Sequence, residues 1–204
     1  EADAACFSFQ AVKNLPTADA GMVCFNRNTD DELARKLSWM GIDKDTYSRV
    51  LPDGTYKWKY DVPYVGFKYN GNSIMAGMAL VSLKYLDQDN DHRNDLADHY
   101  YLQLHDSNEI EFIDVPWECE NNSRHLYQIL VPKEKRDFII DDMYDNGVSP
   151  GVHYITNTKY KMYAHAAYKT PKATEYSDRL ITLPIHCNMT KDDVETVSAL
   201  VRRF

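Results

Sequence analysis

The sequence predicts an α/β fold, because short apolar segments typical of strands alternate with segments that have the apolar periodicity of helices. The 204 residues are 44% hydrophobic and 26% charged, as in globular proteins with a buried core. Aromatic residues reach 12%, with only 8 glycines and 8 prolines, which argues against intrinsic disorder. The net charge of −8 argues against a nucleic-acid partner, since that binding needs clustered lysine and arginine. No apolar run approaches ~20 residues, so we expect no membrane span.

Two short strands are expected near the N-terminus, over residues 4–9 and 21–25, because both segments are apolar and contain aromatic residues. The residues between them then form a loop. Candidate capping residues and acids at 28–32 predict the start of a helix that continues through Leu33 and Leu37 to Met40.

The next stretch, residues 43–65, is rich in tyrosine, proline and charge, and we expect it to be irregular. Apolar residues at helical spacing predict a helix over 74–86. We expect a polar interruption near 87–94, followed by another helix that ends at about residue 104.

The pattern changes after residue 105, where apolar segments at 110–115 and 126–131 predict strands. A helix over 135–146 is expected to end at Gly147, and residues 148–154 to return as a strand. The last helix is expected over 190–203, with Thr190 as its cap and two acids in its first turn. These elements predict a small α/β domain over 106–204, separate from residues 1–105.

Four cysteines are spread along the chain without a CxxC pair, at Cys6, Cys24, Cys119 and Cys187. This spacing suits neither a zinc site nor a disulfide framework, so we expect free, mostly buried thiols in a reducing cytoplasm. No secretory signal is visible. The chain starts at Glu1 rather than at methionine and runs almost directly into a strand, which predicts that the sequence is a fragment.

Lys13 is the first candidate for chemistry, because it lies on a loop between two expected strands, where rigid elements often hold reactive groups. A lysine becomes a nucleophile when its pKa is lowered, and Schiff-base formation with a carbonyl is its main covalent use. The alternative is an ordinary surface lysine, which position alone favours.

The string around Lys13, AACFSFQAVKNLPT at 4–17, resembles the lysine-bearing segment of the DegT/DnrJ/EryC1/StrS family. Members of this family are pyridoxal-phosphate (PLP) aminotransferases that act on nucleotide-linked keto-sugars. The segments YDV and GFKYN at 60–70, GVSPGVHY at 147–154 and LPIH at 183–186 resemble further family segments in the same order. Together these matches extend over nearly all of the chain.

The resemblance implies a PLP-dependent transferase of fold type I, similar to aspartate aminotransferase. Residues 1–105 would form the C-terminal end of its large PLP-binding domain, and residues 106–204 its small domain. The N-terminal part of such enzymes supplies the main phosphate loop, the aromatic ring that stacks on PLP and the acid that pairs with its ring nitrogen. The resemblance also implies a homodimer, glutamate as the amino donor, and a nucleotide-sugar substrate.

Six residues of this chain match family site positions. Lys13 matches the Schiff-base lysine, which also moves a proton during the reaction. Ser8 matches a serine that contacts the cofactor phosphate, and the alternative is a hydroxyl bonded to local backbone. Lys68 and Asn70 match groups offered to the phosphate of the neighbouring subunit's cofactor, and His153 and Tyr154 match a loop near the sugar. For these last four residues the alternatives are a solvated pair beside a helix start and a purely structural loop.

The sequence also departs from the family pattern. Gln10 stands where many members have histidine, Thr158 replaces another histidine, and Cys187 replaces a proline. Ala18 and Ala20 interrupt a glycine run, and alanine tolerates a positive φ poorly. The alternative function is therefore a truncated or degenerate, non-catalytic fragment of such an enzyme. A third possibility, a PLP-dependent sugar dehydratase, is disfavoured because that branch replaces the lysine with histidine.

Overall fold

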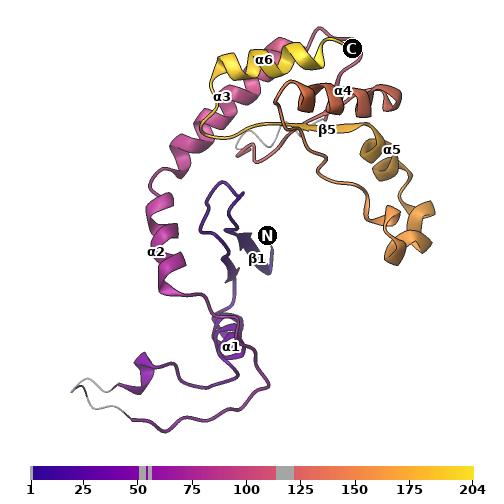
Figure 1. Cartoon of the computed structure of the whole chain (residues 1–204). Helices are drawn as coiled ribbons and strands as arrows, with labels where there is room; N and C mark the ends of the chain where they lie inside the picture. The colour runs from indigo at the N-terminus through magenta and orange to yellow at the C-terminus, as the bar shows by residue number, and fades with distance from the viewer. Residues whose placement is uncertain (1, 51–53, 55–56, 114–121) are drawn as a thin grey trace. The chain divides into compact units, whose positions relative to one another are not determined.

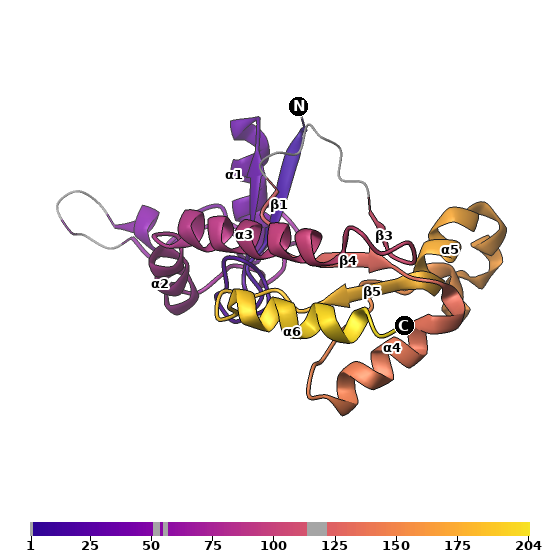
Figure 2. The ribbon, with the colours of Figure 1, turned by 90° about the horizontal axis from the view of Figure 1, so that it is seen from above.

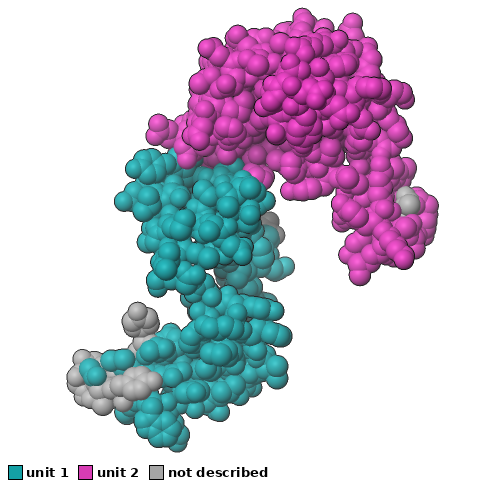
Figure 3. Space-filling view, in the orientation of Figure 1, with its two compact units in different colours: residues 1–86 teal, residues 87–204 magenta. Residues whose placement is uncertain are grey.

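The computed structural model of the chain describes residues 2–50, 54, 57–113 and 122–204. For Tyr47 and Ala167 it describes the backbone but not the side chain. These residues form two compact units, Glu1–Leu86 and Asp87–Phe204 (Figures 1 and 3). Mixed helices and strands occur in both, as the predicted α/β class requires. The predicted domain division at residue 105 stays a prediction.

Unit 1 begins with the two predicted strands, which pair as an antiparallel hairpin. Strand β1 (Ala4–Ser8) lies against β2 (Gly21–Phe25), with Ala4 opposite Phe25 and Ser8 opposite Gly21. Helix α1 (Asn28–Ser38) follows directly. A long excursion, mostly without regular structure, contains the short 3₁₀ helix η1 (Tyr47–Arg49) and leads to helix α2 (Ser73–Ser82). The Asn72 side chain caps α2, since its oxygen accepts a hydrogen bond of 3.0 Å from the Met75 N–H.

Two glycines allow the excursion to return against the end of α1. Gly41 has a φ of 76°, and a Cβ there would lie 1.9 Å from the carbonyl oxygen of Tyr64. At Gly66 a Cβ would lie 2.1 Å from the Gly41 nitrogen. Because both contacts are with backbone, no side chain could be accommodated at either position.

Little of unit 1 is buried. Helix α2 has no buried residue although its sequence, SIMAGMALVS, is apolar on every side, and Ile74, Met78, Leu80 and Val81 are all exposed. Cys6 and Cys24 are free and exposed, as is Cys187, whereas the sequence predicts mostly buried thiols. Cys6 faces Val23 and Cys24 faces Ala5, so the first two thiols lie on opposite faces of the hairpin. Cys119 lies outside the described residues.

Unit 2 contains nearly all of the long helix α3 (Leu86–Leu104) and a three-stranded antiparallel sheet in the order β3 (Glu111–Phe112), β4 (Tyr127–Leu130), β5 (Leu180–Leu183). Helices α4 (Lys133–Asp145), α5 (Pro171–Arg179) and α6 (Lys191–Val201) complete it, with the 3₁₀ segments η2 (Asn157–Lys159) and η3 (Lys161–Lys169). Figure 2 shows α3 and α6 side by side along the sheet.

Two local predictions in this region are wrong. No polar interruption occurs at 87–94, because α3 is continuous from Leu86 and the helix break lies earlier, at 83–85. The acids Asp87 and Asp89 occupy the first turn of α3, where they favour a helix start rather than a break. Residues 148–154 do not form a strand: only Gly151 pairs, through hydrogen bonds of 2.9 and 2.7 Å with Thr182. The predicted strand at 110–115 is described only to residue 113.

The core of unit 2 lies between the sheet and its helices. Leu96, Tyr100 and Leu104 are one turn apart on α3 and are at most 1% exposed. Other core residues come from the sheet and from α4 and α6: Ile129, Ile181, Ile139, Met143, Val194, Val197 and Leu200. The Tyr100 hydroxyl donates to the Pro184 carbonyl at 2.8 Å, and burial raises the pKa of Tyr100 well above its usual value.

The predicted cap of the last helix is confirmed. Thr190 and Asp193 form a reciprocal capping box, in which each side chain accepts a hydrogen bond from the backbone N–H of the other. The hydrogen bonds that the Thr190 N–H and hydroxyl donate to the Asp193 carboxylate lower the pKa of Asp193. The helix therefore starts where the local sequence places it.

Candidate active site

Lys13 lies in the connection between β1 and β2, and backbone hydrogen bonds hold this connection in shape. The N–H of Phe9 donates to Ala20, and the N–H of Ala11 to Ala18, both at 2.8 Å. A turn follows in which the Lys13 N–H donates to the Gln10 carbonyl at 2.9 Å. The Lys13 side chain is half-buried, and no hydrogen bond or ion pair of its amine occurs with the described residues. This amine is therefore available for reaction.

Thr17 closes the loop, a role that the sequence does not indicate. It is fully buried, and its N–H and hydroxyl both donate to the Phe9 carbonyl, at 2.8 and 3.1 Å. Helix α2 also contacts this loop, since the Ser82 hydroxyl donates a hydrogen bond to the Pro16 carbonyl at 3.3 Å. The loop that carries Lys13 is thus fixed at its base and tied to a helix.

Ala18 adopts the left-handed conformation, with φ at 70°. Alanine stands here in place of a family glycine, and the backbone keeps the conformation for which glycine is favoured. Such a conformation costs an alanine about 1 kcal/mol. Ala20, the other departure in this run, does not have a positive φ.

Ser8 is the last residue of β1 and is exposed at the end of the hairpin from which the Lys13 loop emerges. Its hydroxyl oxygen accepts a long hydrogen bond of 3.5 Å from the Gln10 N–H. The Gln10 side chain in turn accepts from the Val12 N–H at 3.0 Å. The hydroxyl proton of Ser8 has no acceptor among the described residues, so it can be donated to a ligand.

Lys68 and Asn70 lie together after the end of α1. The Lys68 amine donates to the Asn70 side-chain oxygen at 2.7 Å and lies 3.9 Å from the centre of the Trp39 ring. Backbone N–H groups of Tyr69 and Asn70 donate to the Ser38 carbonyl, at 2.9 and 3.1 Å. Among the described residues no carboxylate pairs with Lys68, so the pair presents a positive charge and an amide at the surface.

His153 and Tyr154 follow the Gly151 bridge at the edge of β5. The His153 N–H donates to the Thr182 hydroxyl at 3.2 Å, and the Gln128 amide donates to the His153 carbonyl. The two rings meet edge to face with centres 4.9 Å apart, and the Tyr154 side chain is 67% exposed. The Nδ1 atom of His153 is buried and has no partner in the described part of the chain. This loop is ordered by its backbone, while the Tyr154 ring remains exposed.

The six predicted residues thus form three neighbouring pairs. Ser8 and Lys13 share the hairpin, Lys68 and Asn70 are in direct contact, and both pairs belong to unit 1. The third pair, His153 and Tyr154, belongs to unit 2.

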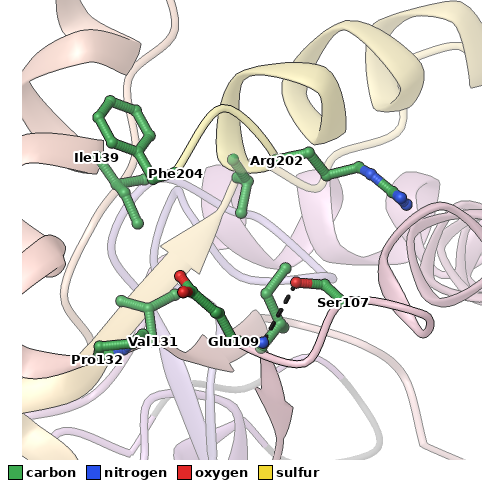
Figure 4. A pocket seen from close by; sticks show the side chains of 9 residues that line it. Ser107, Glu109, Val131, Pro132, Ile139, Arg202 and Phe204 are labelled. Carbon is green, nitrogen blue, oxygen red and sulfur yellow. Dashed lines mark hydrogen bonds between the residues drawn. The ribbon is translucent and has the colours of Figure 1, made fainter.

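A cavity in unit 2 contains none of these residues. It has a volume of about 90 Å³ and lies near the C-terminus, between Glu109, Val131, Ile139 and Phe204 (Figure 4). The Glu109 N–H donates to the Ser107 hydroxyl at its edge, at 3.4 Å. Ligand pockets usually have volumes of about 300 Å³ or more, so this cavity is a packing feature.

Two further properties concern the whole described chain. Over residues 2–50, 54, 57–113 and 122–204, no group of three or more histidine, cysteine, aspartate or glutamate side chains could hold a metal ion. None of the helices in these same ranges is both long and apolar enough to cross a membrane.

A sequence model of one protein family, described as the DegT/DnrJ/EryC1/StrS aminotransferase family, matches residues 1–202. Solved structures with a similar fold support this match. The aminotransferase TlmJ of Streptoalloteichus hindustanus is 26% identical, with a TM-score of 0.87 over 98% of this chain and 52% of its own. Spr1654 of Streptococcus pneumoniae in its PMP form is 29% identical, with a TM-score of 0.86 over 99% of this chain and 53% of its own.

PseC of Helicobacter pylori, an aminotransferase involved in pseudoaminic acid biosynthesis, has a TM-score of 0.85 and covers 99% of this chain and 53% of its own. At 24% identity this likeness concerns the fold alone. Spr1654 has also been solved in a PLP form. The chain spans about half the length of these solved structures.

Proposed function

Because the chain belongs to the DegT/DnrJ/EryC1/StrS aminotransferase family, we propose that it is the lysine-bearing half of a PLP-dependent sugar aminotransferase. The observation that carries this proposal is Lys13, whose unpaired, half-buried amine lies on a braced loop between two strands. The amino donor is glutamate and the acceptor is a nucleotide-linked keto-sugar. The three free thiols suit a cytoplasmic enzyme.

The residues present fit PLP. An amine without a partner suits the cofactor aldehyde, and the unused hydroxyl proton of Ser8 suits its phosphate. When bound, PLP supplies an electron sink for the carbon next to the transferred nitrogen. Lys13 holds the cofactor and then moves a proton at its own Nζ, as a general acid and base.

Lys68 and Asn70 serve the phosphate of the neighbouring subunit in a homodimer. A phosphate favours a cation and a neutral donor, and the contacts with Trp39 and Ser38 keep both groups in place. This role explains why Lys68 lies at the surface without a carboxylate partner among the described residues.

His153 and Tyr154 bind the sugar. The exposed Tyr154 ring offers an apolar face for stacking and a hydroxyl for hydrogen bonding, and the His153 ring packs edge to face against it. Their backbone contacts with β4 and β5 keep the pair rigid before a substrate arrives.

A degenerate, inactive copy is the second candidate, and one observation favours it. Ala18 has a left-handed backbone, with φ at 70°, in the loop that carries Lys13. This conformation is unfavourable for alanine, so the loop has retained backbone strain. The dehydratase alternative is not favoured, because Lys13 is retained.

The test is covalent trapping. The chain is mixed with PLP, scanned for the visible absorbance of a PLP–lysine adduct, reduced with borohydride and mapped by peptide mass spectrometry. We expect the pyridoxyl group on Lys13, and none after Lys13→Ala. The control is Lys84→Ala, since Lys84 is an exposed lysine in a turn of unit 1. Labelling that is absent from Lys13, or spread equally over surface lysines, contradicts the proposal.

A further inference from the structure

The backbone N–H groups of the turn that carries Lys13 all have partners within the loop. The N–H of Ala11 donates to the Ala18 carbonyl at 2.8 Å, and the N–H of Lys13 donates to the Gln10 carbonyl at 2.9 Å. Between them, the N–H of Val12 donates to the side-chain oxygen of Gln10 at 3.0 Å. Gln10 therefore accepts two of these three hydrogen bonds, one through its backbone and one through its side chain.

The side chain of Gln10 stabilises this turn. The hydrogen bond between the Gln10 carbonyl and the Lys13 N–H is that of a β-turn, which leaves the N–H of Val12 unused. A side-chain oxygen that accepts the N–H two residues later is the pattern by which asparagine and aspartate fix turns, and glutamine uses it here. Because Val12 is 67% exposed, its N–H would otherwise bond to water, and the turn would open more easily.

Gln10 also contacts Ser8, the other residue of the hairpin that is proposed to hold PLP. The N–H of Gln10 donates to the Ser8 hydroxyl oxygen at 3.5 Å, a long hydrogen bond that contributes little energy. The backbone and side chain of Gln10 are thus bonded on one side to Ser8 and on the other to Val12 and Lys13. Gln10 is therefore the residue that links the two members of this pair.

The surroundings of the turn contain few titratable groups. Within residues 9–20 only Lys13 and Asp19 are charged, and no ion pair joins these two described residues. The strands beside the loop add Cys6 and Cys24, and α2, which contacts the loop through its Ser82 hydroxyl, has no titratable side chain. Helix α1, which carries several charged side chains, begins at the opposite end of the hairpin from the loop. The hairpin, its loop and α2 contain no histidine, the residue type that ordinarily titrates between about pH 5 and 8.

An uncharged acceptor at position 10 suits a reactive lysine in the same turn. A carboxylate in this turn would attract the proton of the Lys13 amine, and that proton must be lost before the amine can attack an aldehyde. An imidazole would accept the Val12 N–H only while it is neutral, because both nitrogens of the protonated ring are donors. The carboxamide of Gln10 does not titrate, so it holds the turn and adds no charge to it.

We propose that Gln10 is a positioning residue for Lys13, because its side chain fixes the turn through the Val12 N–H and does so independently of pH. Gln10 does not react itself but acts through the backbone of the two residues that follow it in the turn. The inference rests on the proposed function, in which Lys13 binds PLP. It goes further by giving a role to a position at which this chain departs from the family, since many members have histidine there.

Two substitutions of similar size test the acceptor and its independence of pH. Gln10→Met removes the acceptor, and Gln10→His provides one that is lost as the pH falls through about 6.5. Amide exchange of the full chain is measured at about pH 7.5 and about pH 5.5 and corrected for the intrinsic rates. We expect the Val12 amide of Gln10→Met to exchange about three- to fivefold faster at both pH values, as for the loss of one hydrogen bond. Gln10→His should match the unchanged chain at the higher pH and Gln10→Met at the lower.

Borohydride trapping of PLP on Lys13 is the readout that a purely structural contact would not alter. Relative to the unchanged chain at the same pH, the yield on Lys13 should fall about threefold in Gln10→Met at both pH values. In Gln10→His it should fall only at the lower pH. Gln88→Met and Gln88→His are the matched controls, since Gln88 is an exposed glutamine of α3, and both should behave as the unchanged chain does.

The proposal is overturned if Gln10→Met leaves the exchange of the Val12 amide unchanged, or if Gln10→His follows the unchanged chain at the lower pH. Faster exchange with an unchanged yield on Lys13 also overturns it, because the contact would then be structural only. The outcomes for Gln10 and for the proposed function are separable. If the unchanged chain traps no PLP on Lys13, the aminotransferase proposal fails, and the exchange of the Val12 amide decides whether Gln10 holds the turn. If trapping on Lys13 is equal in all variants, the role of Gln10 is removed and the aminotransferase is kept.

Discussion

The hydroxyl and the backbone N–H of Thr17 donate to the same atom, the carbonyl oxygen of Phe9. Eight residues apart, these two positions close the loop that presents Lys13. The double contact forms the most buried point of the hairpin, since Thr17 is 0% exposed. The loop that carries Lys13 is therefore held by a buried side chain farther along the chain.

Thr17→Val tests this arrangement, because valine keeps the shape and the backbone contact but loses the hydroxyl. We expect a loss of about 1 kcal/mol in local stability. Amide exchange of residues 9–20, followed by mass spectrometry, should become faster, and PLP should trap less completely on Lys13. Thr29→Val, at an exposed position in α1, is the matched control. Equal amide-exchange rates of residues 9–20 in Thr17→Val and Thr29→Val would show that the Thr17 hydroxyl does not hold the loop.

Ala18→Gly should stabilise the hairpin. Glycine relieves the left-handed strain at φ 70°, and we expect a gain of up to about 1 kcal/mol, reduced by the greater freedom of glycine when unfolded. Ala20→Gly lacks a strain to relieve and should destabilise by about 0.5–1 kcal/mol. Amide exchange within 9–20 measures both. The opposite order of stability would show that residue 18 is not strained.

Lys68→Gln should reduce cofactor retention without preventing adduct formation on Lys13. The substitution removes the Lys68 amine that lies over Trp39 and, in the proposed role, contacts the PLP phosphate. The loss of one charge-assisted hydrogen bond should weaken PLP binding about tenfold. The measurement is a PLP titration by absorbance, at a concentration where sedimentation shows dimers. Lys57→Gln removes an exposed lysine of the same excursion and should leave affinity unchanged.

Asp178 should make the stability of unit 2 sensitive to acid. Hydrogen bonds from Lys133 and Lys159 lower its pKa to about 2, below the value of an unfolded chain. A lowered pKa stabilises the fold above the unfolded value, and this contribution is lost as the pH falls from about 4 towards 2. The urea midpoint of Asp178→Asn should therefore change less over this range than that of the unchanged chain. Asp141→Asn, at an exposed position of α4, should behave as the unchanged chain does.

Local signals in the sequence were enough for several elements. Thr190 and Asp193 form the predicted cap because a capping box depends on neighbouring residues alone. The strands around Lys13 were also predicted correctly. The supposed break at 87–94 was wrong because its acids were interpreted as solvated turn residues, whereas they occupy the first turn of a helix.

Features that depend on contacts distant in the sequence were missed. Strand β5, only four residues long, has no periodicity of its own and is defined by pairing with β4. The role of Thr17 depends on a closed loop, and the ion pair of Lys133 with Asp178 joins two helices.

Helix α2 has a practical consequence for handling the protein. Its ten residues carry no charge, and none is buried in this chain. The purified chain therefore exposes the hydrophobic surface of this helix to solvent. Such a surface promotes reversible clustering that grows with concentration. Spectroscopy and calorimetry on this chain therefore belong at the lowest workable concentration, with light scattering recorded alongside, so that a signal from clustered molecules is not taken for a signal of ligand binding.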